Sequence, residues 1–268
     1  MDWKNIQECL RLRDLGNGRY EATNYELDYQ RVFSGQILAQ SIAALADLAD
    51  GMAVKSLTQL FSREGSRAEP MAYTVEERHR GRTFASYAVS AHQGDRIVGT
   101  SVAALHRPDA GYERADDPPR VGTPNDAKPV EVGMVPWDIR VVDGVDLQSS
   151  GARPARYSFW MKVPTGHNED WFHQALLAHA TALTLIGTGL LPLDGISHAD
   201  AGTRVATAVT SHSVWFHQQF RLDEWILVDQ TSPVMSAGRC FGRGDVWKSD
   251  GRLVASFAQE AMVRPIGD

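Results

Sequence analysis

Two stretches of the chain have the apolar spacing of helices. The first covers residues 34–45, with Ser34 placed as its N-cap. Its apolar stripe consists of Ile37, Leu38, Ser41, Ile42 and Leu45. The second, Trp171–Ile186, is apolar nearly all the way round, and Asn168 or Asp170 is expected to cap it. A helix with so little polar surface is normally wrapped by other elements, so we expect both helices at the centre of a fold.

Runs rich in β-branched and aromatic residues surround both helices. The strands expected before them are Arg19–Tyr25 and Arg156–Val163, and those expected after them are Val54–Phe61 and Val205–Phe216. Two further runs in each half flank a glycine-containing turn, which is typical of a hairpin. The order is strand, helix, then four strands, twice. This order predicts an α+β fold in which each half is a curled antiparallel sheet around a long central helix.

The two hairpins also match in sequence. Gly81–Pro108 aligns with Gly238–Pro265 without a gap. The identical pairs are Gly81/Gly238, Arg82/Arg239, Phe84/Phe241, Val89/Val246, Gly94/Gly251, Arg107/Arg264 and Pro108/Pro265. Shared ends and a shared turn glycine indicate one unit used twice.

The stretch between the halves has little periodicity. Asp109–Arg153 is rich in proline, aspartate and glycine, as expected of a linker that crosses the surface. Within it, Val130–Val142 is the place for a short strand or a docked extended segment. We therefore predict an N-terminal domain over residues 1–108, a linker over 109–153 and a C-terminal domain over 154–268.

Composition narrows the function classes for this chain of 268 residues. The net charge is −6 and basic residues are scattered, which argues against nucleic acid or an anionic membrane as partner. No apolar run is long enough to cross a membrane and the first residues form no export signal, so we expect a cytoplasmic protein. Cys9 and Cys240 lack metal-ligand or disulfide spacing. We expect no metal and no other cofactor.

Three motifs resemble those of the acyl-CoA thioesterase II (TesB-like) family. Val32-Phe33-Ser34-Gly35-Gln36 is similar to its Val-Phe-Gly-Gly-Gln motif at the start of the first helix. His212-Ser213-Val214-Trp215-Phe216-His217, followed by Glu224-Trp225-Ile226-Leu227, is similar to its His-Ser-Met-Trp-Phe-His and Glu-Trp-Leu-Leu motifs. Gln259-Glu260 matches its terminal Gln-Glu segment. The resemblance implies a tandem double hotdog that hydrolyses fatty-acyl-CoA by direct water attack.

The family places an Asp, a Thr or Ser, and a Gln around the attacking water. The Gln carries over to Gln259, but the Asp position holds Ala182 and the hydroxyl position holds Val209. A shift of one residue would bring Thr210 into the hydroxyl position. In the gapless hairpin alignment Gln259 corresponds to Val102, so the polar side chain occurs in one copy of the unit only. This asymmetry favours a single site in the second half.

Other residues near the missing acid are candidates to replace it. His179 lies one turn before Ala182 and is a candidate base, and Thr181 is a candidate to hold a water. Gly35 and Gln36, at the start of the first helix, are expected to contact substrate because N–H groups there are unpaired. Ala182 and Val209 are expected to line the same pocket.

Three functions remain open at this point. The first is an acyl-CoA thioesterase weakened by the loss of the acid, because a positioned base contributes about 10² to 10⁴ in rate. The second is a catalytically weak acyl-CoA binding or regulatory protein. The third is a hydratase built on Asp170 and His173, which lie within one helical turn. Edge-to-edge pairing of the two sheets is expected within the chain, and a homo-oligomer through these sheets is a further expectation.

Overall fold

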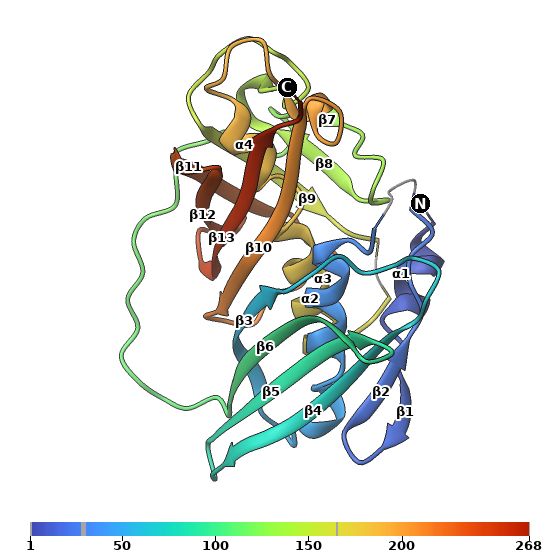
Figure 1. The fold of residues 1–268 in the computed structure, drawn as a ribbon. Coiled ribbons are helices and arrows are strands. Elements are labelled where there is room, and N and C mark those ends of the chain that lie inside the picture. The colour runs from blue at the N-terminus through green and yellow to red at the C-terminus, as the bar shows by residue number, and fades with distance from the viewer. Residues whose placement is uncertain (1, 28–30, 165, 268) are drawn as a thin grey trace.

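The computed structural model describes residues 2–27, 31–164 and 166–267. These residues form a 13-stranded sheet, antiparallel throughout, in the order β1-β2-β4-β5-β6-β3-β10-β13-β12-β11-β9-β8-β7 (Figure 1). The strands of the first half are β1 Arg13–Gly16, β2 Arg19–Ala22, β3 Ala53–Phe61, β4 Met71–Arg80, β5 Phe84–Gln93 and β6 Arg96–His106. Those that follow are β7 Lys128–Val130, β8 Asp138–Val141, β9 Arg156–Lys162, β10 Val205–Phe216, β11 Ile226–Ser236, β12 Arg239–Lys248 and β13 Leu253–Pro265. The predicted order of strand, helix and four strands is confirmed in both halves.

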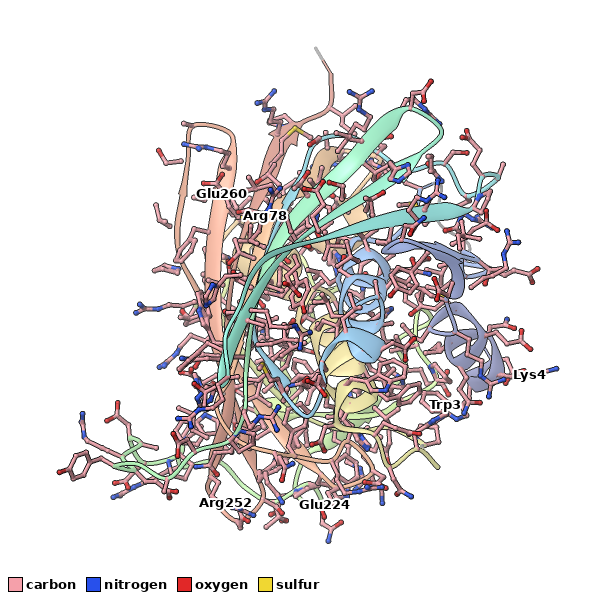
Figure 2. All side chains as sticks on the ribbon, turned by 90° about the horizontal axis from the view of Figure 1, so that it is seen from below. Trp3, Lys4, Arg78, Glu224, Arg252 and Glu260 are labelled. Carbon is pink, nitrogen blue, oxygen red and sulfur yellow. The ribbon has the colours of Figure 1, made fainter. Side chains whose placement is uncertain are left out.

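The helices are α1 Trp3–Cys9, α2 Ser34–Ala43, α3 Asp170–Thr181 and α4 Leu185–Leu190, with short 3₁₀ turns at Ala46–Leu48, Val142–Gly144 and His198–Asp200. The central helices α2 and α3 lie inside the curved sheet, whereas α1 lies at the periphery (Figure 1). Figure 2 shows α2 and α3 side by side, with the labelled side chains of Lys4, Glu224 and Arg252 at the periphery. No helix of the described ranges is long and apolar enough to cross a membrane.

The helix starts differ from the sequence prediction. Ser34 is the first helical residue and Phe33 occupies the N-cap, with no side-chain hydrogen bond. In the second half the N-cap is Glu169, not Asn168 or Asp170. Both caps have extended backbone, so each helix begins where the chain turns into the core, not where a capping side chain is available.

The helix expected over Trp171–Ile186 is broken in two. α3 ends at Thr181 and α4 begins at Leu185. The hydroxyl of Thr181 donates to the carbonyl of Ala178, and that of Thr188 donates to the carbonyl of Thr184. Hydroxyls that bond back to the preceding turn compete with the helical ladder and bend helices, which accounts for a break at this point.

The two halves are joined by the pair β3 and β10. Each of these strands has a bulge, at Lys55 in β3 and at Thr210 in β10. Aligning the bulges matches Ala53-Val54-Lys55-Ser56-Leu57-Thr58 with Ala208-Val209-Thr210-Ser211-His212-Ser213. Thr58 and Ser213 then correspond to each other, and their hydroxyl oxygens lie 3.0 Å apart where the strands cross. The pair therefore has an approximate twofold axis at this contact.

The bulges correct the hairpin alignment by one residue. Leu57 pairs with Ala103, and His212 pairs with Gln259. Ala103, not Val102, is thus the counterpart of Gln259. Val102 is 59% exposed, whereas Ala103 and Gln259 are each 3% exposed. The conclusion that the polar residue occurs in one copy only is unchanged, because Leu57 and Ala103 are both apolar.

Part of the predicted linker is built into the second half of the sheet. β8 pairs with β9, and β7 pairs with β8 at the edge of the sheet. Val135 and Trp137 beside them are buried. Residues 107–118, by contrast, are exposed throughout and form the long outer loop between β6 and β7 (Figure 1).

Candidate active site

A cavity of about 320 Å³ lies between the two halves, where β10 runs past the end of β3. Its walls are the start of α2, the loop after β3, the junction of α3 and α4, and the first part of β10. The lining residues include Ser34, Ile37, Ala182, Leu183, His198 and Val209. The wall is largely apolar, as in sites that enclose an aliphatic ligand.

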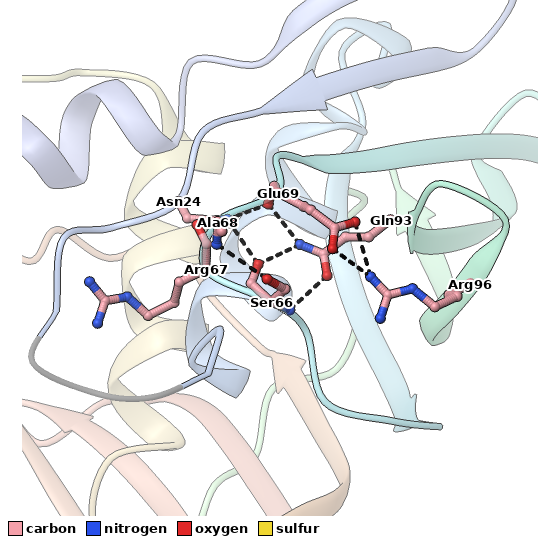
Figure 3. Close-up of polar contacts among 7 residues, drawn as sticks. All are labelled: Asn24, Ser66, Arg67, Ala68, Glu69, Gln93 and Arg96. Carbon is pink, nitrogen blue, oxygen red and sulfur yellow. Dashed lines mark hydrogen bonds and ion pairs between the residues drawn. The ribbon is translucent and has the colours of Figure 1, made fainter.

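The loop after β3 is held in place by the side-chain amides of Gln93 and Asn24, of which Gln93 is buried. The side-chain amide of Gln93 donates to the carbonyls of Ser66 and Glu69, and its oxygen accepts from the backbone N–H of Ser66. Asn24 donates to carbonyls of the same segment (Figure 3). The backbone N–H of Val32 also donates to the carbonyl of Gly65. This network fixes the loop that forms one wall of the cavity.

Three side chains that do not line the cavity form a buried hydrogen-bonded chain, and one of them, Thr181, directly precedes Ala182 of the cavity wall. Thr181 Oγ1 lies 2.9 Å from His212 Nε2, and His212 Nδ1 lies 3.1 Å from Gln259 Oε1. All three side chains are 3% exposed or less. Thr181 comes from the end of α3, His212 from β10 and Gln259 from β13. The sheet register places the last two side by side on its inner face.

Burial determines the protonation state of this chain. It lowers the pKa of His212 from 6.5 to about 4, although the hydrogen bond to Gln259 opposes the shift. The imidazole is therefore neutral at pH 7, with a proton on one nitrogen only. Within the described ranges, the amide nitrogen of Gln259 has no hydrogen-bond partner. It remains available as a donor.

Ala182 and Val209 hold the two positions that lack the family's polar side chains. Both residues line the cavity. Among the described residues of its wall, Glu64 carries the one carboxylate, and this group pairs with Arg31 at 2.8 Å. The one carboxylate of the described wall is thus engaged in an ion pair.

Thr210 also lines the cavity, but not as the missing hydroxyl. It is the bulged residue of β10, and its hydroxyl donates to the carbonyl of Glu260 at 3.0 Å. Side chains along a strand normally alternate between its two faces, and Val209 and His212 lie on the inner face. The bulge interrupts this alternation at Thr210. The hydroxyl group bonded within the site is that of Thr181.

His179 is placed in the core, away from the cavity wall. Its ring lies 5.0–5.4 Å from the rings of Tyr25, Phe33 and Trp137, and it is fully buried. Neither ring nitrogen has a hydrogen-bond partner in the described part of the chain. Burial lowers the pKa of His179 from 6.5 to about 3. A base so enclosed cannot exchange protons with the cavity, so its predicted role as replacement base does not fit the structure.

The two residues expected at the start of α2 have packing contacts. A side chain at Gly35 would meet the ring of Phe33 and the carbonyl of His179, so glycine is needed there for the approach of α2 to α3. Gln36 accepts from the backbone N–H of Tyr25 and donates to Asn24 and Gln40. Neither residue lines the cavity. Their neighbours Ser34 and Ile37 do, so the predicted substrate contacts of Gly35 and Gln36 do not fit this geometry.

A second cavity, of about 610 Å³, lies at the other end of the β3–β10 pair. It is lined by Ala53, Val54 and Lys55 and by the segment after β10, Phe216–Phe220. These are the twofold counterparts of Ala208, Val209 and Thr210 and of Phe61–Gly65 in the first cavity. Here the carboxylate of Asp170 accepts from Gln219, and the amide of Gln174 donates to the carbonyl of Val54.

The pair required for a hydratase is also committed to other contacts. Asp170 is bonded to Gln219, whereas His173 Nδ1 accepts from the backbone N–H of Leu222. The two side chains thus serve separate structural contacts at the start of α3. This arrangement does not favour the hydratase hypothesis.

Two residues of the site were missed by sequence reasoning. His212 stood within a matched motif, but nothing in the motif indicated that it would contact both Thr181 and Gln259. Its strand register was the available signal. His198 lines the cavity from a 3₁₀ turn, and its ring lies against Gly187 of α4. Burial lowers the pKa of His198 below 6.5, so it is neutral at pH 7.

Comparisons with known proteins agree with this architecture. Residues 26–106 match the family model of the acyl-CoA thioesterase N-terminal domain, and residues 109–263 match that of the C-terminal domain. Acyl-CoA thioesterase 2 of Haemophilus influenzae is 26% identical over 97% of both chains. Acyl-coenzyme A thioesterase 8 of Mus musculus is 27% identical over 97% of this chain and 88% of its own length.

Solved structures show the same fold. The acyl-CoA thioesterase II TesB2 of Mycobacterium marinum superposes with a TM-score of 0.83 at 27% identity, covering 98% of this chain and 99% of its own. A hotdog-fold protein of Alicyclobacillus acidocaldarius superposes with a TM-score of 0.78 at 16% identity, with 98% of each chain covered. The molecule is thus a double hotdog. The chain belongs to the acyl-CoA thioesterase family, of the TesB-like kind.

Proposed function

We propose that this protein hydrolyses acyl-CoA thioesters in the cavity between α2 and β10. The observation that supports the proposal most is the convergence of the site positions. Ala182 and Val209 line one cavity, and Gln259, which has a free amide donor, is linked through His212 to Thr181, the residue before Ala182. The family match over both halves supplies the substrate class.

The cavity wall suits the two parts of such a substrate. Ile37, Leu183 and Ile186 offer apolar surface to an acyl chain. Arg31 and Arg63 stand on the wall near the loop after β3. Guanidinium groups favour phosphate, so this side suits the nucleotide end of coenzyme A.

Hydrolysis requires a water oxygen to attack the thioester carbon. The carbon–sulfur bond then breaks, and the thiolate of coenzyme A takes up a proton. In the proposed site Gln259 donates to the developing oxyanion, and the neutral ring of His198 accepts the proton from water. Because no carboxylate stands at Ala182, we expect slow turnover, about 10² to 10⁴ below that of a site with a positioned acid.

The second candidate is an acyl-CoA binding protein with negligible turnover. The apolar side chains at Ala182 and Val209 favour it, because they keep the shape of the cavity while removing groups that would hold a water. The two candidates predict the same binding and different chemistry.

A paired measurement separates them. Release of coenzyme A from a series of acyl-CoA thioesters is followed spectroscopically, and binding of the same compounds is measured by calorimetry. We expect binding with slow release for the natural chain, and release reduced at least tenfold in Gln259→Ala. Binding without release above the uncatalysed rate would favour the second candidate.

The matched control is Gln230→Ala. Gln230 is a buried glutamine of β11 that donates to Thr184 and Thr188, and it has no hydrogen bond to Thr181, His212 or Gln259. Its replacement should cost similar stability without the loss of turnover. Equal losses in both variants would mean that Gln259 acts through folding.

A further inference from the structure

In the hydrogen-bonded chain of Thr181, His212 and Gln259, each contact has a donor and an acceptor, so the chain has a direction. Thr181 supplies a hydroxyl proton and His212 supplies a single ring proton. Gln259 supplies either an oxygen or an N–H group, according to the rotation of its amide. Since the neutral imidazole donates at one nitrogen and accepts at the other, the tautomer of His212 fixes which side of the Gln259 amide faces the site.

We infer that His212 is a positioning residue that holds Gln259 with its amide N–H groups toward the substrate; the inference rests on the proposed function. In the structure His212 Nδ1 faces Gln259 Oε1 at 3.1 Å. An oxygen accepts, so the proton lies on Nδ1. Nε2 is then an acceptor for the Thr181 hydroxyl, 2.9 Å away, whose one proton is shared between Nε2 and the carbonyl of Ala178 in a three-centre hydrogen bond. Gln259 is left as a donor to a carbonyl oxygen, and the opposite tautomer would leave it as an acceptor.

The twofold axis supplies an independent reason to assign His212 to function. Its counterpart is Leu57, and the counterpart of Gln259 is Ala103. Leu57 is fully buried and Ala103 is 3% exposed in an equivalent strand pair. The fold therefore tolerates an apolar pair at this position. A histidine and a glutamine buried there carry a desolvation cost that packing alone does not require.

The surroundings of His212 keep it in one charge state. Its ring stacks near Phe257, with 6.1 Å between centroids, and Gln59 of β3 faces it across the sheet. Gln59 donates to the backbone carbonyl of Leu60. No charged side chain contacts the ring within the described ranges, so His212 stays neutral and the direction of the chain persists across the neutral pH range.

The test combines kinetics with nitrogen NMR of the full chain. His212→Leu introduces the residue that the first half already carries, and we expect kcat to fall about tenfold or more with little change in KM or Tm. His212→Asn keeps a donor near the position of Nδ1 and should recover part of kcat. In a Gln259→Ala background, His212→Leu should have no further effect, since the two act on one contact.

The control variant is Gln59→Val. Gln59 is as buried as His212 and lies directly across from it, and its own twofold counterpart is Val214. Its hydrogen bonds are with Ser41 and Leu60 and not with Gln259, so the kcat of the variant should stay within about twofold of the natural chain. An equal loss in this variant would overturn the positioning role.

The NMR readout does not depend on turnover. The nitrogen shifts of His212 should show a protonated Nδ1 and an unprotonated Nε2 at pH 7. A proton on Nε2, or additive losses for His212→Leu and Gln259→Ala, would overturn the inference. If the natural chain itself released no coenzyme A, the proposed function would fail, while the tautomer would still report on the contact.

Discussion

The two cavities at the ends of the β3–β10 pair have the same backbone plan and different chemistry. In each, a bulged strand from one half passes the start of the helix from the other half. Around the first cavity the inner face carries His212 and Gln259, and at the equivalent place in the other half it carries Leu57 and Ala103. The two halves thus share the backbone fold, but only the second half carries the hydrogen-bonded polar side chains.

The first turns of α2 and α3 also differ, in their charge. In the second cavity the first turn of α3 carries Asp170, a negative charge that occupies the positive end of the helix. In the first cavity the first turn of α2 has no acidic residue. The start of α2 is therefore free to favour an anionic or carbonyl oxygen, whereas the start of α3 is already neutralised.

The strongest test of the comparison is to transfer the polar pair. Leu57→His with Ala103→Gln should lower the free energy of unfolding by about 2–5 kcal/mol, because the first half offers no hydroxyl equivalent to Thr181 at that place. Denaturant unfolding measures this cost. The reverse exchange, His212→Leu with Gln259→Ala, should leave stability nearly unchanged and abolish turnover. Equal stability costs in both directions would contradict the distinction between the halves.

Restoring the acid should have a smaller effect, and in the other direction. Ala182→Asp should raise turnover by about tenfold to a hundredfold, because a carboxylate that can act as a base would then line the cavity. The gain is limited because Ala182 caps the C-terminus of α3, where the helix dipole disfavours a negative charge. Adding Val209→Thr should help more in this variant than alone. Coenzyme A release and Tm, measured on one preparation, would distinguish chemical rescue from a folding effect.

The enclosed ring of His179 makes a prediction about stability and pH. Its pKa is lowered from 6.5 to about 3, so the unfolded chain binds a proton there below pH 6.5 and the folded chain does not. The free energy of unfolding is therefore unaffected by this titration above pH 6.5, and it falls as the pH drops from 6.5 toward 3. His179→Leu should weaken that acid dependence and raise stability at pH 7 by about 1 kcal/mol. Thermal unfolding between pH 5 and 8 checks both, with turnover expected to remain.

The smallest effect concerns the connection between the halves. Limited proteolysis should cut first within residues 109–118, since they are exposed throughout and form no strand. The segment from β7 to β8 should resist, because it is paired to the sheet. The nicked halves should remain associated on gel filtration through the β3–β10 pair. Early cuts in β5 or β6, or separation of the fragments, would be inconsistent with one continuous sheet.

Much of the fold could be predicted from sequence, because periodicity and turn residues are local signals. The hairpin turns at Gly94 and Gly251, and the central helices, follow from such patterns. The break between Thr181 and Leu185 could not, since it depends on hydroxyls bonding back to the helix. The bulges at Lys55 and Thr210 were also invisible, and they shift the repeat by a single residue from Val102 to Ala103.

The candidate site was less accessible to sequence reasoning. The positions of Ala182, Val209 and Gln259 carried over from motifs, and the first two line the cavity. His179 was chosen because it lies one turn from Ala182, but a helix apolar all round gives no indication of which face meets the cavity. Contacts between strands, such as His212 with Gln259, depend on register, which sequence spacing alone does not fix.

The most direct test of the account is to block each cavity at equivalent positions. Ala208 lines the first cavity and its twofold counterpart Ala53 lines the second, so Ala208→Trp and Ala53→Trp are a matched pair. The measurement is kcat/KM for coenzyme A release in both folded variants. We predict a loss of at least tenfold for Ala208→Trp and little change for Ala53→Trp. The reverse result, or equal losses, would contradict the assignment of hydrolysis to the cavity between α2 and β10.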